Sequence, residues 1–222
     1  MSKSKSKIKS VKKAIRKKIG QSSKPIRIKD PISYMKKSFK KNGKSYTTFL
    51  KGLLRRKIRG LDSVALTLNT LAFEQIDCLK CANCCKTMSP TYKKADVKRI
   101  SKHLGMTFQG YYDKYLEIDE DSGDYMNKST PCQFLRKDNK CAIYAVRPRD
   151  CSGFPHTQWR DFKLYISGTH IQNIEYCPIT HHVVERMHDI IIKKGLRNLT
   201  VNTVEEDIKH TQMIHDELHS HY

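Results

Sequence analysis

The run Cys78-Leu-Lys-Cys81-Ala-Asn-Cys84-Cys85 places four cysteines within eight residues. Spacings of two residues bring successive thiolates to one side of a tight loop, from which they can reach one metal ion or cluster. Cysteines that serve only as small buried apolar residues do not produce this spacing. The stretch therefore predicts a metal-binding loop around which the rest of the domain is organised.

Four more cysteines follow, each beside residues that are typical of turns. Cys132 follows a proline, Cys141 follows Asn139-Lys140, Cys151 follows Arg147-Pro148-Arg149-Asp150, and Cys177 precedes a proline. Turns present thiolates at the tips of loops, as metal sites require. We therefore expect eight ligands whose sulfurs gather in one or two groups: Cys78, Cys81, Cys84, Cys85, Cys132, Cys141, Cys151 and Cys177.

The sequence leaves the division of these ligands open. Because side chains of adjacent residues diverge, Cys84 and Cys85 should serve different sites, unless one of them is not a ligand. Eight thiolates make either two four-ligand sites, or one cluster with four ligands and four structural or redox-active cysteines. An iron–sulfur cluster or Zn²⁺ is the expected cofactor, since both accept four cysteines. We favour the iron–sulfur cluster slightly.

The cysteines and their neighbours resemble the YkgJ-like cysteine-cluster family, whose CxxCxxCC domain is described as zinc- or iron-chelating. The resemblance covers about residues 74–180 and implies metal or iron–sulfur binding through all eight cysteines. A flagellin lysine methylating enzyme carries a similar cluster, so the resemblance leaves open a cluster-dependent protein-modifying enzyme. The matching pieces are the 78–85 run, Asp96–Ile100 with Leu104-Gly105, Pro131–Leu135, Cys141–Tyr144, Arg147-Pro148 with Cys151 and Phe154-Pro155, and Cys177-Pro178.

Charge divides the chain into two parts. The formal net charge is +21, and residues 1–60 carry 22 Lys and Arg against a single acid, Asp30. Residues 61–222 carry 21 basic and 21 acidic residues, together with every cysteine. We therefore expect a basic arm over 1–60, partly disordered and partly helical, and a cysteine-cluster metal-binding domain over 61–222.

The basic arm predicts an anionic partner. A nucleic acid or the ribosome is the first expectation, and an anionic membrane surface is the second, since Ile8, Val11, Ile15 and Ile19 recur at near-helical spacing. A zinc-containing nucleic-acid-binding protein is thus a further alternative. No run of 18 apolar residues exists, so no transmembrane segment is expected. Without an apolar stretch after the basic N-terminal residues, we expect a cytoplasmic protein with reduced thiols.

The remaining motifs assign no catalytic residue. The chain has no G-x-S-x-G, Walker, dinucleotide-binding or H-E-x-x-H motif, and its cysteines are clustered rather than isolated. Near the cysteines, His156 could ligate the metal or donate a hydrogen bond to a sulfur. Arg147 is expected to have a structural role, and Tyr144 and Phe154 to pack against the metal loop and exclude water.

The apolar periodicity predicts a helix-rich α+β domain, compact and with cysteine-rich loops. Helices are expected over 8–19, 45–59, 93–104, a short segment capped by Thr107, 181–194 and 203–219, with extended strands at 63–76 and 159–167, a linker at 21–31, an acidic loop at 118–130 and a disordered tip at 1–10.

Overall fold

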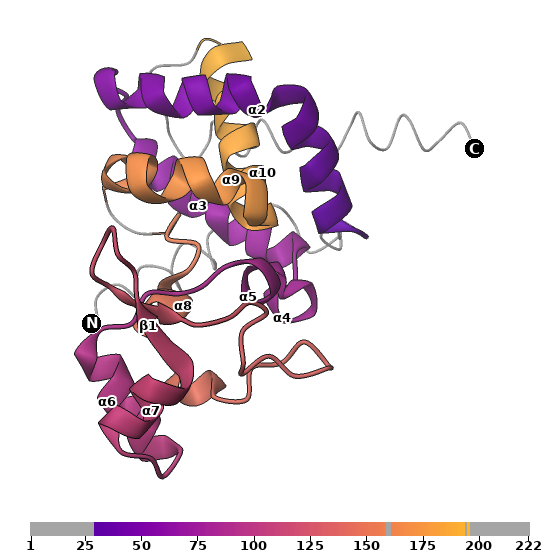
Figure 1. Ribbon diagram of the computed structural model, residues 1–222. Helices are drawn as coiled ribbons and strands as arrows, with labels where there is room; N and C mark the ends of the chain where they lie inside the picture. The colour runs from indigo at the N-terminus through magenta and orange to yellow at the C-terminus, as the bar shows by residue number, and fades with distance from the viewer. Residues whose placement is uncertain (1–28, 159–160, 194, 196–222) are drawn as a thin grey trace. The chain divides into compact units, whose positions relative to one another are not determined.

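A computed structural model describes residues 29–158, 161–193 and 195. The expectations for residues 1–28 and for a helix at 203–219 lie outside this part of the chain. Helices account for most of the described residues (Figure 1), and β1 (Leu116–Ile118) pairs antiparallel with β2 (Tyr125–Asn127). The helix-rich α+β class is confirmed.

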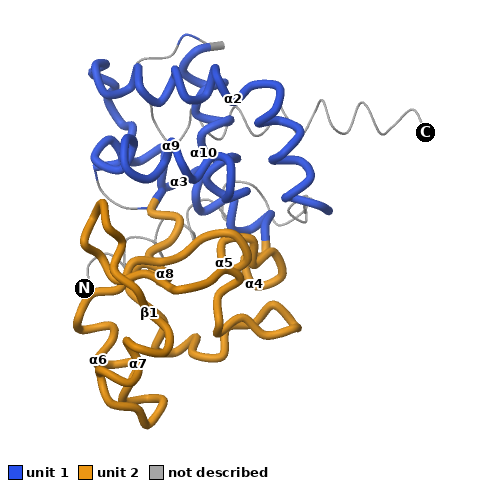
Figure 2. Tube along the Cα trace, viewed as in Figure 1, with its two compact units in different colours: residues 1–76, 157–222 blue, residues 77–156 orange. Residues whose placement is uncertain are grey.

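The chain divides into two compact units, which are described separately (Figure 2). Unit 1 combines the residues up to Ile76 with those from Thr157 onward, and unit 2 runs from Asp77 to His156. Part of the expected basic arm, Pro31–Arg55, is a helix of unit 1.

Unit 1 consists of helices packed around an apolar core. Helix α10 contacts both α2 and α3, and α9 contacts α2. The core includes Met35, Leu50, Leu53, Val64, Leu68, Ile174, Val183 and Met187. The elements are α2 (Pro31–Arg55), α3 (Leu61–Gln75), η2 (Phe162–Tyr165), η3 (Ile166–His170), α9 (Ile171–Tyr176), α10 (Pro178–His188) and η4 (Asp189–Lys193). The helix predicted over 181–194 is thus confirmed as α10 followed by η4, with an earlier start.

Helix α2 begins well before the helix predicted over 45–59. The Asp30 side chain accepts a 2.9 Å hydrogen bond from the Ser33 amide, and Pro31 stands in the first turn. Arg56 is extended, so the helix ends at Arg55. Phe49, Leu50 and Leu53 are buried as expected, whereas Leu54 is 44% exposed and does not belong to the buried face.

The extended segment predicted over 63–76 is wrong, because these residues form α3. Val64, Leu66 and Leu68 alternate with polar residues, which suggested a strand. However, α3 is buried on several sides, and its polar residues Thr67, Asn69 and Thr70 are buried as well. The hydroxyls of Thr67 and Thr70 donate to carbonyls one turn earlier, so they enter the core without loss of hydrogen bonds. Because polar residues also lie on the buried faces of α3, the apolar residues alone did not show a helical periodicity.

The strand predicted over 159–167 is also wrong for its described residues. Residues 162–170 form the consecutive helical turns η2 and η3. Phe162, Ile166 and His170 are buried at intervals of four residues, whereas Leu164, which a strand would place on the same face, is 77% exposed. The Phe162 ring stacks on the His170 ring with 4.3 Å between centroids.

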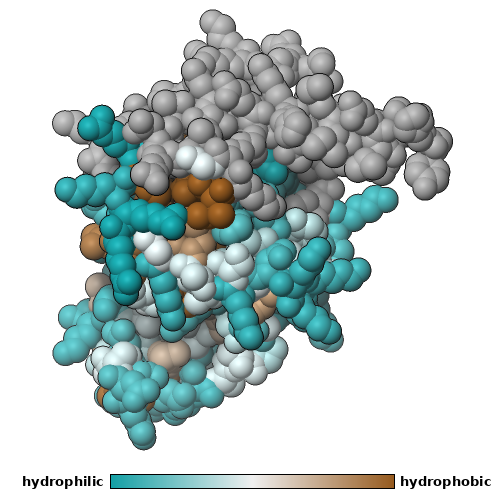
Figure 3. Space-filling model, turned by 90° about the horizontal axis from the view of Figure 1, so that it is seen from above, coloured by the Kyte–Doolittle hydropathy of each residue, from teal (hydrophilic) through white to brown (hydrophobic). Residues whose placement is uncertain are grey.

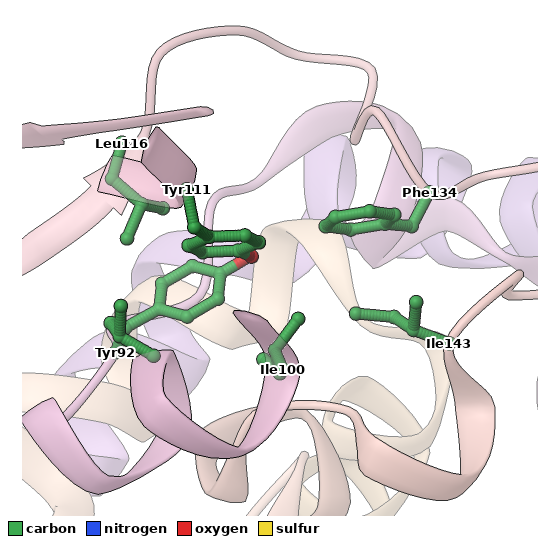
Figure 4. Packing of buried hydrophobic residues seen from close by; sticks show 7 residues of the cluster. Tyr92, Ile100, Tyr111, Leu116, Phe134 and Ile143 are labelled. Carbon is green, nitrogen blue, oxygen red and sulfur yellow. The ribbon is translucent and has the colours of Figure 1, made fainter. Parts of the chain in front are cut away.

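Unit 2 is built around a small aromatic and aliphatic core. Its elements are α4 (Cys78–Cys81), α5 (Asn83–Thr87), α6 (Lys94–His103), α7 (Phe108–Tyr115), β1, β2, η1 (Tyr144–Val146) and α8 (Arg149–Gly153). The core cluster, most of which is labelled in Figure 4, comprises Tyr92, Val97, Ile100, Tyr111, Leu116, Phe134 and Ile143.

Two predictions for unit 2 are confirmed and one is refined. Helix α6 matches the helix predicted over 93–104, and the Thr107 side chain caps α7 by accepting a 3.0 Å hydrogen bond from the Gly110 amide. The acidic loop expected at 118–130 contains the turn of the β1–β2 hairpin and the strand β2.

On the face shown in Figure 3, most of the described side chains are hydrophilic, and a small apolar patch lies next to them. Within the described ranges, no helix has both the length and the apolar character that a membrane crossing requires.

Candidate metal centre

The 78–85 segment folds as two short helical turns. The Asp77 carboxylate accepts hydrogen bonds from the amides of Leu79 (3.1 Å) and Lys80 (3.4 Å), which starts α4. Ala82, with φ of 47°, adopts the left-handed conformation and redirects the chain into α5. Cys78 and Cys81 therefore stand at the two ends of α4, and Cys84 and Cys85 lie on α5.

Cys84 and Cys85 stay close together, contrary to the expected divergence of adjacent side chains. Their Sγ atoms are 4.0 Å apart. The Cys84 thiol, and secondly burial, raise the pKa of Cys85 well above its usual range. The helical turn permits this approach, since it rotates neighbouring side chains by about 100° and not by the 180° of a strand.

Four cysteine thiols of unit 2 all interact electrostatically with one another. Burial is the first cause that raises the pKa of Cys132, Cys141 and Cys151, and repulsion between thiolates adds to it. Every one of the six pairs among Cys85, Cys132, Cys141 and Cys151 contributes to this repulsion. Segments that are far apart in sequence are therefore brought together at these four thiols.

Backbone hydrogen bonds hold three of the four segments against one another. The Cys132 amide donates a 2.8 Å hydrogen bond to the Cys85 carbonyl. Leu135 and Cys141 form an isolated antiparallel bridge, next to a 2.8 Å bond from the Ala142 amide to the Phe134 carbonyl. The segments that carry Cys85, Cys132 and Cys141 are thus held side by side through main-chain atoms.

The other predicted ligands are placed differently. Cys78 is exposed and Cys81 is partly buried, both within unit 2. Cys177 is buried in unit 1, where it precedes the first turn of α10. Seven of the eight cysteines therefore belong to unit 2, and the eighth to unit 1.

The apolar core of unit 2 lies against the thiols. Cys132 and Cys141 pack on the core cluster. Tyr92 and Tyr111 are buried, and their pKa values are raised first by burial and further by the neighbouring thiols of Cys132 and Cys151. The core therefore excludes water from one side of the cysteine set, which strengthens electrostatic interactions there.

Two aspartates position helix α8, which carries Cys151. Asp96, 1% exposed, accepts a 3.2 Å hydrogen bond from the Arg149 amide and a 2.6 Å bond from Arg99. Asp150 accepts a 3.1 Å bond from the Thr91 amide. Sequence reasoning did not assign a role to either aspartate, although Asp150 is adjacent to a predicted ligand.

His156 is engaged by Asp150. Its Nε2 lies 2.9 Å from Asp150 Oδ1, so this nitrogen donates to a carboxylate and is not directed to a sulfur. Burial would raise the pKa of Asp150, but the hydrogen bonds from His156 and the Thr91 amide lower it below its usual range. His156 therefore helps to orient the residue next to Cys151.

Arg147 has the structural contacts that the sequence suggested. Its Nη1 donates a 2.6 Å hydrogen bond to the Tyr144 carbonyl, and its guanidinium lies 3.8 Å from the centre of the Tyr144 ring. Tyr144 is 48% exposed, so the prediction that it excludes water from the metal loop is wrong. The cation on its face holds this ring at the surface.

The cysteine thiols have the chemistry of metal ligands, but their sulfur atoms are not yet arranged around a metal position. The buried Asn127 Nδ2 has no oxygen or nitrogen partner, and the Cys132 thiol lies beside its side chain, ready to accept as a thiolate. A cation would offset the repulsion between thiolates that adds to the effect of burial on the pKa values of Cys132, Cys141 and Cys151. However, no three His, Cys, Asp or Glu side chains of the described residues are already arranged to hold a metal ion.

Comparison with known proteins identifies the cysteine-containing region. Residues 77–178, which contain all eight cysteines, match the family model described as "CxxCxxCC: Putative zinc- or iron-chelating domain". An uncharacterised protein of Methanocaldococcus jannaschii is 33% identical over 113 residues, a stretch that covers 50% of this chain and 59% of that protein. No solved structure matches the chain. The region from residue 77 to residue 178 is therefore similar to the CxxCxxCC family, and the chain spans 59% of the length of the curated relative that it matches.

Proposed function

We propose that unit 2 binds zinc or iron through the thiolates of Cys85, Cys132, Cys141 and Cys151. The observation that carries this proposal is the main-chain pairing of the segments that hold Cys85, Cys132 and Cys141. The mutual influence of all four thiols on their pKa values supports it. The family description of zinc or iron chelation supports the same function. Cysteine thiolates are soft ligands that suit Zn²⁺ and iron–sulfur clusters alike.

Metal binding requires the four thiols to close up. In a tetrahedral zinc site the Zn–S bonds are about 2.3 Å, which places the sulfurs roughly 3.8 Å from one another. The described sulfurs do not yet form such a group. We expect the short helices and loops that carry them to adjust when the metal binds, because metal binding supplies free energy for local folding.

Three further cysteines of unit 2 could extend the centre. Cys84 lies 4.0 Å from Cys85, and Cys78 and Cys81 precede them in the same pair of helical turns. A multinuclear iron–sulfur cluster, or a second four-ligand site, would draw on these thiols. Cys177 remains a predicted eighth ligand.

The proposal is tested by anaerobic purification followed by metal analysis and visible absorbance. Iron with sulfide and a brown colour would assign an iron–sulfur cluster, whereas colourless protein with stoichiometric zinc would assign a zinc site. We expect Cys132→Ser and Cys151→Ser to lose most of the bound metal. Ser152→Ala, which leaves every thiol in place on the same helix, should retain it. Unchanged metal content in both cysteine variants would refute the four-thiol site.

A further inference from the structure

Helix α2 and the residues directly after it expose many basic side chains and no acidic ones. From Pro31 to Gly60 the sequence has ten Lys and Arg and no Asp or Glu. All ten side chains belong to exposed residues: Lys36, Lys37, Lys40, Lys41, Lys44, Lys51, Arg55, Arg56, Lys57 and Arg59. We call these ten residues the basic face of α2.

The described carboxylates of unit 1 do not pair with these ten cations. Among the residues that the structure describes, none of the ten forms an ion pair. The acidic residues nearest in sequence accept hydrogen bonds from backbone amides. Asp30 caps α2, and Asp62 accepts hydrogen bonds from the amides of Asp161 (3.1 Å) and Phe162 (3.0 Å). The basic face therefore carries a strong positive potential.

The opposite side of α2 is used up by the core of unit 1. Met35, Tyr46 and Leu53 are at most 4% exposed, and Leu50 is fully buried. A helix that binds a membrane surface needs a free apolar face to enter the lipid, with cations beside it. Since α2 buries most of its apolar residues inside the unit and exposes only Tyr34 and Leu54 among the large ones, its remaining surface fits a chain of phosphates better than a bilayer.

We propose that the basic face of α2 binds the phosphodiester backbone of a nucleic acid. The site lies outside the cysteine set and does not depend on bound metal. The seven Lys and Arg that lie on α2 itself keep the spacing of a folded helix, so phosphates can be neutralised without ordering these cations first. Release of condensed counterions from the nucleic acid would supply the affinity, and the interaction would be sensitive to salt.

The test compares two variants of the full chain that lose the same charge. Lys37, Lys41 and Lys44 are replaced by Gln on α2, and Lys94, Lys98 and Lys102 are replaced by Gln on α6 as the matched control. All six residues are exposed, and Gln keeps nearly the same helix propensity as Lys. Binding is measured by fluorescence anisotropy at several salt concentrations, with a labelled DNA duplex of about 20 base pairs and with single-stranded RNA of equal length.

We expect the α2 variant to lose at least tenfold in affinity for one or both probes at low salt. If each lysine contacts one phosphate, the slope of log affinity against log salt should fall by about 0.9 per lysine on duplex DNA. The α6 control should change little, and metal content should stay the same in both variants. Whether DNA or RNA responds more strongly identifies the natural source of the phosphates.

Equal losses in the two variants would overturn the proposal, because binding would then follow net charge alone. No loss in the α2 variant would overturn it as well. Binding of the full chain to phosphatidylserine vesicles, reduced by the α2 substitutions while neither nucleic acid binds, would replace the nucleic acid with a membrane surface. Circular dichroism of the α2 variant must match that of the parent for either reading.

Discussion

The hydroxyl of Tyr34 on α2 donates a 2.6 Å hydrogen bond to Oε2 of Glu185 on α10. Ser38 and Tyr46, also on α2, donate to Oε1 at 2.8 and 3.0 Å. Burial, and next the bond to Glu185, raise the pKa of Tyr34 above its usual range. One buried carboxylate thus collects three hydroxyls from a single neighbouring helix and fixes how α2 packs on α10.

Replacing Glu185 by Ala should lower the free energy of unfolding by about 2–4 kcal/mol, since three hydroxyls would lose their charged acceptor in a buried place. Urea-induced unfolding followed by circular dichroism measures the change. Glu175→Ala on the exposed side of α9 is the matched control and should change stability by less than about 0.5 kcal/mol. Equal effects of the two substitutions would mean that the hydroxyl–carboxylate contacts add nothing.

His181 should make the stability of unit 1 sensitive to acid. Burial lowers its pKa below the ordinary value of 6.5, although the Ile174 carbonyl and Glu185 act in the opposite direction. Below pH 6.5 the unfolded chain binds a proton at this position that the folded chain does not, so stability falls as the pH decreases.

His181→Asn tests this dependence, because its amide can still donate to the Ile174 carbonyl, 3.0 Å from the present Nδ1. We expect the variant to lose less stability than the parent between pH 7 and pH 5, in urea titrations of metal-free protein. Parallel pH profiles for the two proteins would contradict the assignment.

Asn127 should tune the affinity of the proposed metal site. It is 5% exposed and accepts hydrogen bonds from the Tyr92 hydroxyl (2.6 Å) and from Gln133 Nε2 (3.0 Å), while its side chain favours the thiolate of Cys132. Asn127→Ala should weaken metal binding by roughly 10- to 100-fold, as measured by competition with a chelator. Gln109→Ala, exposed on α7, serves as the control. Equal metal affinities of the two variants would show that Asn127 does not contribute to the metal site.

Removal of metal should affect the cysteine loops more than the core of unit 2. The segments around α4, α5 and residues 130–155 carry the proposed ligands, whereas α6 buries Val97 and Ile100 completely. Because binding free energy becomes folding free energy in such loops, their amides should exchange hydrogen faster in the metal-free protein while α6 stays protected. Equal exchange with and without metal would show that the loops fold independently of it.

Local signals in the sequence were reliable where one feature decided the structure. The Thr107 cap and the helix over 93–104 were confirmed, because a capping side chain and one apolar stripe act within a few residues. The period failed at 63–76, where polar residues such as Thr67 are buried through their own hydroxyl bonds. It also failed at residues 161–167, where Phe162 and Ile166 are spaced as on a helix.

The sequence by itself determined the cysteine pattern and the charge of residues 31–60, because ligand chemistry and net charge depend on residue type alone. The tertiary structure alone decided which thiols lie near one another. Main-chain bonds between distant segments bring Cys85, Cys132 and Cys141 close, and Asp150 ties the helix of Cys151 to the Thr91 amide. No spacing along the chain encodes these contacts. The tertiary structure also decided that the basic stretch 31–55 is a folded helix. Its apolar face is buried against α9 and α10, which come from a distant part of the chain.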